Sequence, residues 1–267
     1  MRTTRVRWLM VLVAGVLVLG ACGGSNNNKS SAGGTTSTTS KVNGDITVFA
    51  AASLTDAFGD MKAAFEKAYP GTTVKFNFAG SQALREQILS GAPADVFASA
   101  NTSNMDQIVK ANKASNPQTF ATNKLEIAVP PSNPGKVTGL EAFGMENLKI
   151  GLCAEEVPCG QFGRQALQKA GVTPKPDTNE PDVRALLTKV QTGDLDAGLV
   201  YKTDVLSAGT GVKGIAIPDN LNVVATYPIA TITGSSNSTL AQAWVDFVMS
   251  PDGQKILQKR GFTPATT

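Results

Sequence analysis

Two stretches of small and hydroxyl-bearing residues carry the strongest chemical signal in the sequence. The first, FAAASLTDA, contains Ser53, and the second, FAGSQAL, contains Ser81. Each follows a β-rich apolar run and precedes a helical pattern, so each serine is expected at a helix N-terminus, where unpaired N–H groups and the helix dipole favour an anion. The two motifs together predict an anion site, although each alone also fits an ordinary N-cap serine.

The elements around these motifs alternate between strands and helices. We expect strands at residues 45–51, 74–79 and 95–98, and helices at residues 54–69, 82–89 and 105–111. Such alternation predicts a mainly parallel sheet with helices on its faces. A strand at residues 125–129, followed by two prolines, is expected to leave this unit.

A second α/β unit is expected to follow. Its predicted strands are residues 149–152 and 197–201, and its predicted helices are residues 161–170 and 183–190. The β-rich run 223–233 and an amphipathic helix at 240–259, interrupted at Pro251-Asp252-Gly253, are then expected to return to the first unit and close it.

The N-terminus has the layout of an exported lipoprotein. Three arginines precede an apolar run at residues 8–19, which ends in Leu-Gly-Ala-Cys22 and resembles a bacterial lipobox. We therefore expect residues 1–21 to be a signal peptide, Cys22 to carry lipid, and the polar residues 22–43 to form a disordered tether. The protein is then held on the extracytoplasmic face of the cell membrane by the lipid alone.

The charge and the composition exclude several classes of protein. Of 24 basic residues three lie in the signal segment, which leaves 21 against 21 acidic residues, and no basic cluster indicates nucleic-acid binding. The absence of histidine excludes a Ser-His-Asp triad and a His-ligated zinc site. A nucleophile at Ser53 or Cys159 would need another base. We therefore expect a binding protein and not an enzyme.

Cys153 and Cys159 remain as a pair once Cys22 is assigned to lipid. Five intervening residues allow a small disulfide loop, and export to an oxidising compartment favours it over two free thiols. A metal site at this pair would lack further soft ligands.

Several motifs make the resemblance to one family specific. They are VFAAASLTDAF, FNFAGSQALREQILSGAPADVFASA, EEVPCGQFGRQALQKAG, EPDVRALLTKVQTGDLDAGLVYKTD and PDGQKILQKRGF. In this order and spacing they resemble the periplasmic molybdate-binding proteins of bacterial molybdate ABC transporters. The resemblance implies a type II periplasmic-binding fold: two α/β lobes, each a mainly parallel sheet flanked by helices, joined by a two-strand hinge. Residues 44–124 with 228–267 would form lobe I, and residues 125–227 lobe II.

The resemblance also implies a set of ligand-binding residues. The family holds molybdate through serine hydroxyls, main-chain N–H groups and a tyrosine hydroxyl, and these carry over to Ser53, Ser81, Cys159, Val183 and Tyr201. Many relatives have alanine where this chain has Cys159. Because that position contributes a main-chain N–H, the substitution need not disturb binding.

These residues suit a tetrahedral dianion. Molybdate at neutral pH only accepts hydrogen bonds, so a donor-only site fits it, whereas phosphate carries a proton and calls for an acceptor. We expect molybdate first and tungstate second, with molybdenum bound only as molybdate and no cofactor. A sulfate or thiosulfate receptor is the alternative. The implied protein partners are the permease of the molybdate importer and its ATPase, and the chain is expected to be a monomer.

Overall fold

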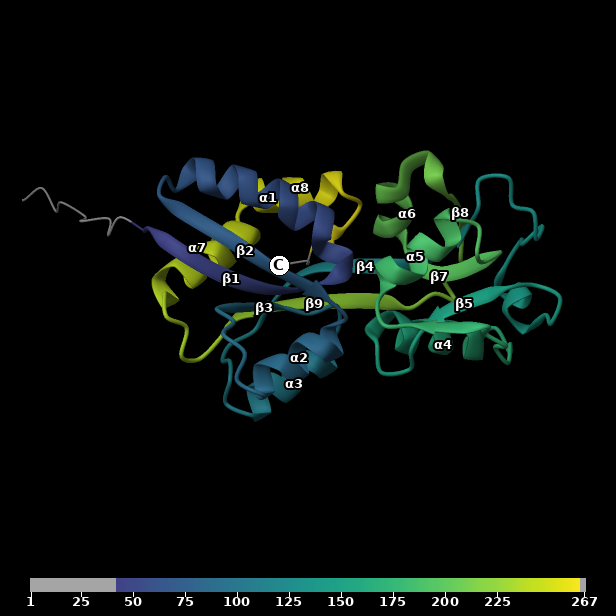
Figure 1. Cartoon of the computed structure of the whole chain (residues 1–267), viewed down its shortest axis with the longest axis horizontal. Coiled ribbons are helices and arrows are strands. Elements are labelled where there is room, and N and C mark those ends of the chain that lie inside the picture. The colour runs from purple at the N-terminus through teal and green to yellow at the C-terminus, as the bar shows by residue number, and fades with distance from the viewer. Residues whose placement is uncertain (1–41, 265–267) are drawn as a thin grey trace, which may run out of the picture. The chain divides into compact units, whose positions relative to one another are not determined.

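The computed structural model describes residues 42–264, which belong to one compact unit, Lys41–Thr267 (Figure 1). The predicted signal peptide, the lipobox with Cys22 and nearly all of the predicted tether lie outside the described residues. Within residues 42–264, no helix combines the length and the apolar character needed to cross a membrane.

Lobe I is built on three parallel strands with helices on both faces. The strands β1 (Gly44–Ala51), β2 (Thr72–Ala79) and β3 (Val96–Ala98) lie in the order β2-β1-β3. Successive β1 residues face opposite sides, because side chains alternate along a strand. Val48 therefore packs in the core with α1 (Thr55–Ala68), whereas Phe49 packs against α2 (Ser81–Leu89) and α3 (Thr102–Lys110).

Two helices at the end of the chain complete lobe I on the α1 side of the sheet (Figure 1). They are α7 (Ser238–Met249) and α8 (Pro251–Lys259), and Ser250 caps α8 by accepting a hydrogen bond from Gly253 N–H. The predicted interruption therefore lies at the helix-starting Pro251. Trp244 of α7 is fully buried, with its ring edge-on to Phe58 and Phe65.

Two long antiparallel strands connect the lobes. The strand β4 (Gln118–Val129) pairs with β9 (Val224–Thr231) through Lys124 and with strands of the second lobe from Leu125 onward. β9 pairs with β3 on its other side, so the chain returns to lobe I along it. A two-residue strand, β10 (Thr263–Pro264), also pairs with β4.

Lobe II repeats the α/β pattern. Its strands are β5 (Ile150–Cys153), β6 (Thr178–Glu180), β7 (Ala197–Tyr201) and β8 (Lys213–Ala216), with β5 parallel to β6 and β7. Its helices are α4 (Pro158–Lys169), α5 (Val183–Gln191) and α6 (Lys202–Ala208), and the short 3-10 helices η2 (Leu140–Gly144) and η3 (Gly209–Gly211) complete it. The predicted two-lobed α/β fold, with parallel strands at the centre of each lobe, is confirmed.

Several local details differ from the expectations. The helix α6 and the short strands β6, β8 and β10 were not predicted, and Lys202, directly after the predicted strand 197–201, is the first residue of α6. Ser81, expected at a helix N-terminus, is the first residue of α2, and Gly80 is the N-cap residue. Ser53 lies inside the 3-10 helix η1 (Ala52–Leu54) instead of capping α1. The chain makes one more tight turn at this strand end than the sequence pattern indicates.

Candidate functional site

The five residues implied by the family resemblance come together around one cavity between the lobes. It is small, with about 10 Å³ open to the centre of a water-sized group, so it suits a compact ligand. Its walls are formed by the ends of strands and the beginnings of helices from both lobes. The lining residues are Ala51, Ala52, Ser53, Ala79, Gly80, Ser81, Ala100, Val157, Pro158, Cys159, Asp182, Val183 and Tyr201.

Each of the five predicted residues lies at the N-terminus of a helix. Ser53 is in η1, which leads into α1, and Ser81 and Val183 are the first residues of α2 and α5. Cys159 is the second residue of α4, and Tyr201 is the N-cap of α6. First-turn N–H groups have no partner within their own helix, and the dipole makes this end positive. Five such ends around one small cavity create a site for an anion.

Each of the two serine hydroxyls has one protein partner. Ser81 Oγ accepts a hydrogen bond from Ala100 N–H at 3.0 Å, and Ser53 Oγ lies 2.9 Å from the hydroxyl of Tyr227. Both serines are almost fully buried. Within residues 42–264, neither serine oxygen accepts a hydrogen bond from a first-turn N–H of its own helix, so neither acts as an ordinary N-cap.

Tyr201 presents an unpaired hydroxyl at the cavity. The side chain is 1% exposed, and its oxygen has no hydrogen-bond partner within residues 42–264. Burial raises the pKa of Tyr201 well above its ordinary value, so the hydroxyl keeps its proton. A buried donor without a partner is costly, and a bound acceptor in the cavity would relieve that cost.

One carboxylate, that of Asp182, lines the cavity, and the sequence analysis did not predict it. Asp182 Oδ1 accepts hydrogen bonds from Arg184 N–H at 2.8 Å and Ala185 N–H at 3.0 Å and so caps α5. Its place in the sequence, directly before the predicted site residue Val183, could have indicated that Asp182 lines the cavity. Its carboxylate is directed to its own helix.

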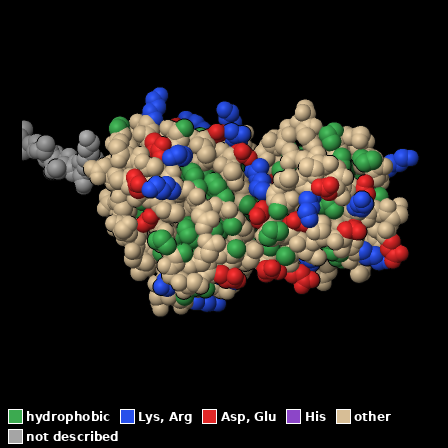
Figure 2. Space-filling view, viewed as in Figure 1, with side chains coloured by type: hydrophobic (Ala, Val, Ile, Leu, Met, Phe, Trp, Pro, Cys, Tyr) green, Lys and Arg blue, Asp and Glu red, His purple; other side chains and the backbone are tan. Residues whose placement is uncertain are grey.

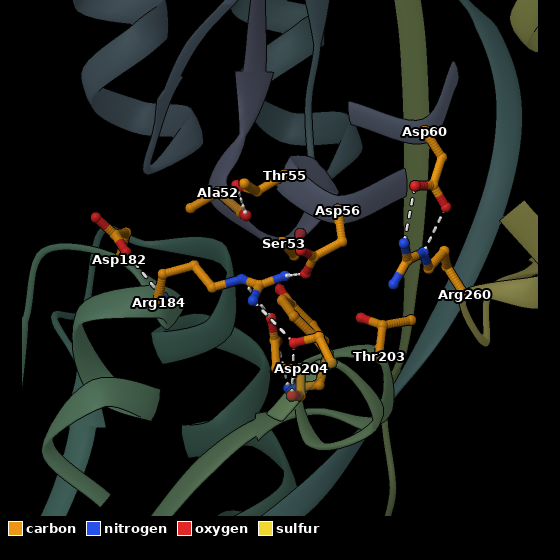
Figure 3. A network of polar contacts seen from close by, with 12 residues as sticks. Ala52, Ser53, Thr55, Asp56, Asp60, Asp182, Arg184, Thr203, Asp204 and Arg260 are labelled. Atoms are coloured by element: carbon orange, nitrogen blue, oxygen red, sulfur yellow. Dashed lines mark hydrogen bonds and ion pairs between the residues drawn. The ribbon is translucent and has the colours of Figure 1, made fainter. Parts of the chain in front are cut away.

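A charged network lies beside the cavity and joins the lobes (Figure 3). Arg184 Nη2 of α5 lies 2.5 Å from Asp56 Oδ2 of α1, and Arg184 Nε lies 3.2 Å from Asp204 Oδ1. The second contact lacks hydrogen-bond geometry, because neither atom has a hydrogen-bond partner within residues 42–264, and it is a Coulombic contact. Asp204 Oδ2 accepts Tyr201 N–H at 3.1 Å, which ties this network to the Tyr201 backbone.

Burial governs the ionisation of Asp204. The side chain is fully buried, and this raises the pKa of Asp204 to about 6, while the nearby Arg184 acts in the opposite direction. Asp56 lies in the first turn of α1 and contacts the same guanidinium. The family resemblance did not reveal this network, because it depends on residues that are distant in sequence.

The predicted disulfide is present. Cys153 ends β5 and Cys159 is in the first turn of α4, with their Cα atoms 5.8 Å apart and their sulfurs bonded at 2.01 Å. The next residue, Gly160, is packed so tightly that a Cβ atom there would lie 1.9 Å from Ala154 O. The loop that supplies the Cys159 N–H is therefore fixed by a covalent bond and by close packing.

Direct contacts hold the lobes together across the cavity. Gln82 Nε2 donates to Pro181 O at 3.2 Å, and Asn101 Nδ2 donates to Gln161 Oε1 at 3.0 Å. Gly80 lies at this junction, and a Cβ atom there would lie 2.6 Å from Pro181 O. Hydrogen bonds and close packing therefore join the two lobes beside the cavity.

The part of the chain that the structure describes contains no candidate metal-binding site. Within residues 42–264, no group of three or more His, Cys, Asp or Glu side chains is arranged to hold a metal ion. On the face shown in Figure 2, basic and acidic side chains are interspersed. The helix N-termini in the cavity thus remain the strongest candidate site.

The chain is similar to known solute-binding proteins. Residues 46–263 match the family model of bacterial extracellular solute-binding proteins. The chain is 39% identical over 262 residues to the molybdate-binding protein ModA of Mycobacterium tuberculosis, covering 96% of this chain and 98% of that protein.

Two solved structures share the fold. The Azotobacter vinelandii periplasmic molybdate-binding protein has a TM-score of 0.74 at 19% identity, covering 83% of this chain and 100% of that one. The sulfate-binding protein SubI of Mycobacterium tuberculosis has a TM-score of 0.75 at 16% identity, covering 83% of this chain and 87% of that one. The extensive sequence match shows more than a shared fold: the chain belongs to the family of bacterial extracellular solute-binding proteins, which are not enzymes, and it is related within that family to the periplasmic molybdate-binding proteins of ABC transporters.

Proposed function

We propose that this protein captures molybdate outside the cytoplasm and delivers it to an ABC importer. The observation that carries the proposal is the buried, unpartnered hydroxyl of Tyr201 facing a cavity that is surrounded by helix N-termini. In this proposal Ser53, Ser81 and Tyr201 donate hydroxyl protons, and Cys159 and Val183 donate main-chain N–H groups, to the oxygens of one anion.

The lining favours a compact dianion over other solutes. None of the residues that line the cavity is Lys or Arg, so dipoles and neutral donors would balance the ligand charge. The small volume disfavours sugars and peptides. Phosphate would bring a proton that needs an acceptor, and the one carboxylate in the wall, Asp182, uses Oδ1 to cap its own helix.

Sulfate or thiosulfate is the alternative ligand. It has the same charge as molybdate, and the similarity to a sulfate-binding protein shows that the fold alone does not separate the two. The 39% identity to a molybdate-binding protein over nearly the whole chain favours molybdate. Tungstate matches molybdate in shape and charge, so we propose that it binds at the same site.

The proposed site needs no cofactor. Molybdenum would enter only as molybdate, held through its oxygens. The permease of the importer and its ATPase are the proposed partners, and we propose that a monomer carries out the capture.

A direct test uses native mass spectrometry of residues 42–267 with equimolar molybdate, tungstate and sulfate. We expect one anion per protein, with molybdate and tungstate outcompeting sulfate. Sulfate occupancy above that of molybdate would favour the alternative, and no adduct with any of the three would contradict the proposal.

The membrane anchor is a separate part of the proposal. It rests on the arginine-flanked apolar run and on Cys22 at its end. Changing Cys22→Ser should release the full-length protein from the membrane fraction, while the affinity of the released protein for molybdate stays unchanged. Equal membrane partitioning of variant and parent would contradict lipid attachment.

A further inference from the structure

Tyr227 is a buried tyrosine that contacts the site without lining the cavity. It lies on β9, is fully buried, and its hydroxyl is 2.9 Å from Ser53 Oγ. Its ring is packed edge-on against Phe120, Phe262 and Tyr201, with ring centres 5.4 to 6.2 Å away. This packing fixes the direction from which the hydroxyl approaches Ser53.

The distance alone does not say which hydroxyl donates, but the surroundings do. Within residues 42–264, the atom with hydrogen-bond geometry toward the Tyr227 hydroxyl is Ser53 Oγ, whereas the side chains of Tyr201 and Asn123 lie nearby without that geometry. If Ser53 donated, the proton of Tyr227 would be left buried without a well-placed acceptor, at a substantial free-energy cost. If Tyr227 donates, its proton is paired. Burial also raises the pKa of Tyr227 well above its ordinary value, so this proton is retained.

A Ser53 hydroxyl that accepts from Tyr227 has its own proton left to donate. The same arrangement exists at Ser81, whose oxygen accepts from Ala100 N–H. Both serines thus receive one hydrogen bond from the protein.

We propose that Tyr227 is a positioning residue of the anion site, which donates to Ser53 and thereby directs the Ser53 proton into the cavity. The inference rests on the proposed function, because it assigns the anion as the acceptor of that proton. Its consequence is selectivity: with Ser53 fixed as a donor, the site favours an oxyanion with bare oxygens over one that carries a proton.

A double-mutant cycle in molybdate binding tests this role. Tyr227→Phe keeps the ring and removes the hydroxyl, and it should weaken molybdate affinity about 3- to 10-fold, as expected for one lost neutral hydrogen bond. In a Ser53→Ala background the same change should alter affinity less than about twofold, since there is no serine proton to direct. Tyr69→Phe, at the end of α1 and outside the cavity lining, is the matched control and should leave affinity unchanged.

A second cycle without ligand keeps the test independent of the proposed function. Ser53→Ala should lower the melting temperature, because it leaves the buried Tyr227 proton without an acceptor, and adding Tyr227→Phe should restore part of the loss. Equal weakening of molybdate binding by Tyr227→Phe in both backgrounds, or additive losses of melting temperature, would overturn the inference. If the parent failed to bind molybdate, the proposed function would fail, and the melting cycle would still decide whether Tyr227 donates to Ser53.

Discussion

In the proposed site, the two lobes supply the same kind of hydrogen bond to the anion by different means. Lobe I would contribute the hydroxyls of Ser53 and Ser81, each of which has one protein partner. Lobe II would contribute the first-turn N–H groups at Cys159 and Val183 together with one hydroxyl, that of Tyr201. Side-chain donors depend on residue type, whereas main-chain donors depend on backbone position. Substitutions of the two serines in lobe I should therefore change the hydrogen bonds offered to the anion directly. Most substitutions in lobe II should leave its main-chain donors in place.

The largest expected effect is in lobe I. Ser81→Asp would place a negative charge against the dianion in a closed cavity, where a repulsion of about 4 kcal/mol at contact distance corresponds to roughly a thousandfold loss of affinity. Ser81→Ala removes only one hydrogen bond to a charged group, so we expect a loss of roughly 10- to 100-fold. Calorimetric titration with molybdate, with melting temperatures measured alongside, separates the two variants. Parent-like affinity of the Asp variant would remove Ser81 from the site.

Val183 tests the main-chain donors of lobe II, with the next largest effect. Val183→Ala keeps the N–H and should change molybdate affinity by less than about twofold. Val183→Pro removes the N–H at the first helical position, which proline tolerates, and Asp182 before it is already extended, as a residue preceding proline must be. We expect the Pro variant to lose roughly 10- to 100-fold in affinity with an intact helix. The circular dichroism of both variants serves as the folding control, and equal affinities would show that this N–H does not contact the anion.

This contrast between the lobes also explains what the sequence could predict. The serines of lobe I stand in local motifs, Ala-Ser-Leu-Thr and Gly-Ser-Gln, so their place at strand-to-helix junctions could be predicted from residue types alone. Cys159 and Val183 are expected to act through their backbones, so only the resemblance to a family indicated them. Because ligands gather at the carboxyl ends of parallel strands, the predicted fold places the serines at this end of the lobe I strands and the other residues at the same end of the lobe II strands.

Long-range partners could not be predicted from local patterns. Ser53 meets Tyr227 across 174 positions, and Arg184 meets Asp56 across 128 positions, and neither pair has a spacing signal. The helix α6 was missed for a related reason: it is seven residues long and begins directly at the end of β7, so its pattern is too short to distinguish from a continuing strand.

The smallest expected effect concerns Asp204, the buried carboxyl group that accepts a hydrogen bond from Tyr201 N–H. Burial raises the pKa of Asp204 to about 6 from an ordinary value of 3.8, so between these values the native state holds a proton that the unfolded state has lost. The free energy of unfolding should therefore fall as the pH rises from about 4 to about 6, by no more than about 1.4 kcal/mol per pH unit for one group. Asp204→Asn keeps an oxygen that accepts Tyr201 N–H, and Arg184 keeps its contact with Asp56, so the variant should fold and lose this slope.

Asp60→Asn in lobe I is the contrasting control. A hydrogen bond from Arg260 lowers the pKa of Asp60, so its contribution is present at neutral pH and is lost as the pH falls. Urea unfolding at pH 4, 5, 6 and 7 measures both slopes. If Asp204→Asn had the same pH dependence as the parent, Asp204 would be ionised throughout, and its hydrogen bond to Tyr201 N–H would not depend on pH in this range.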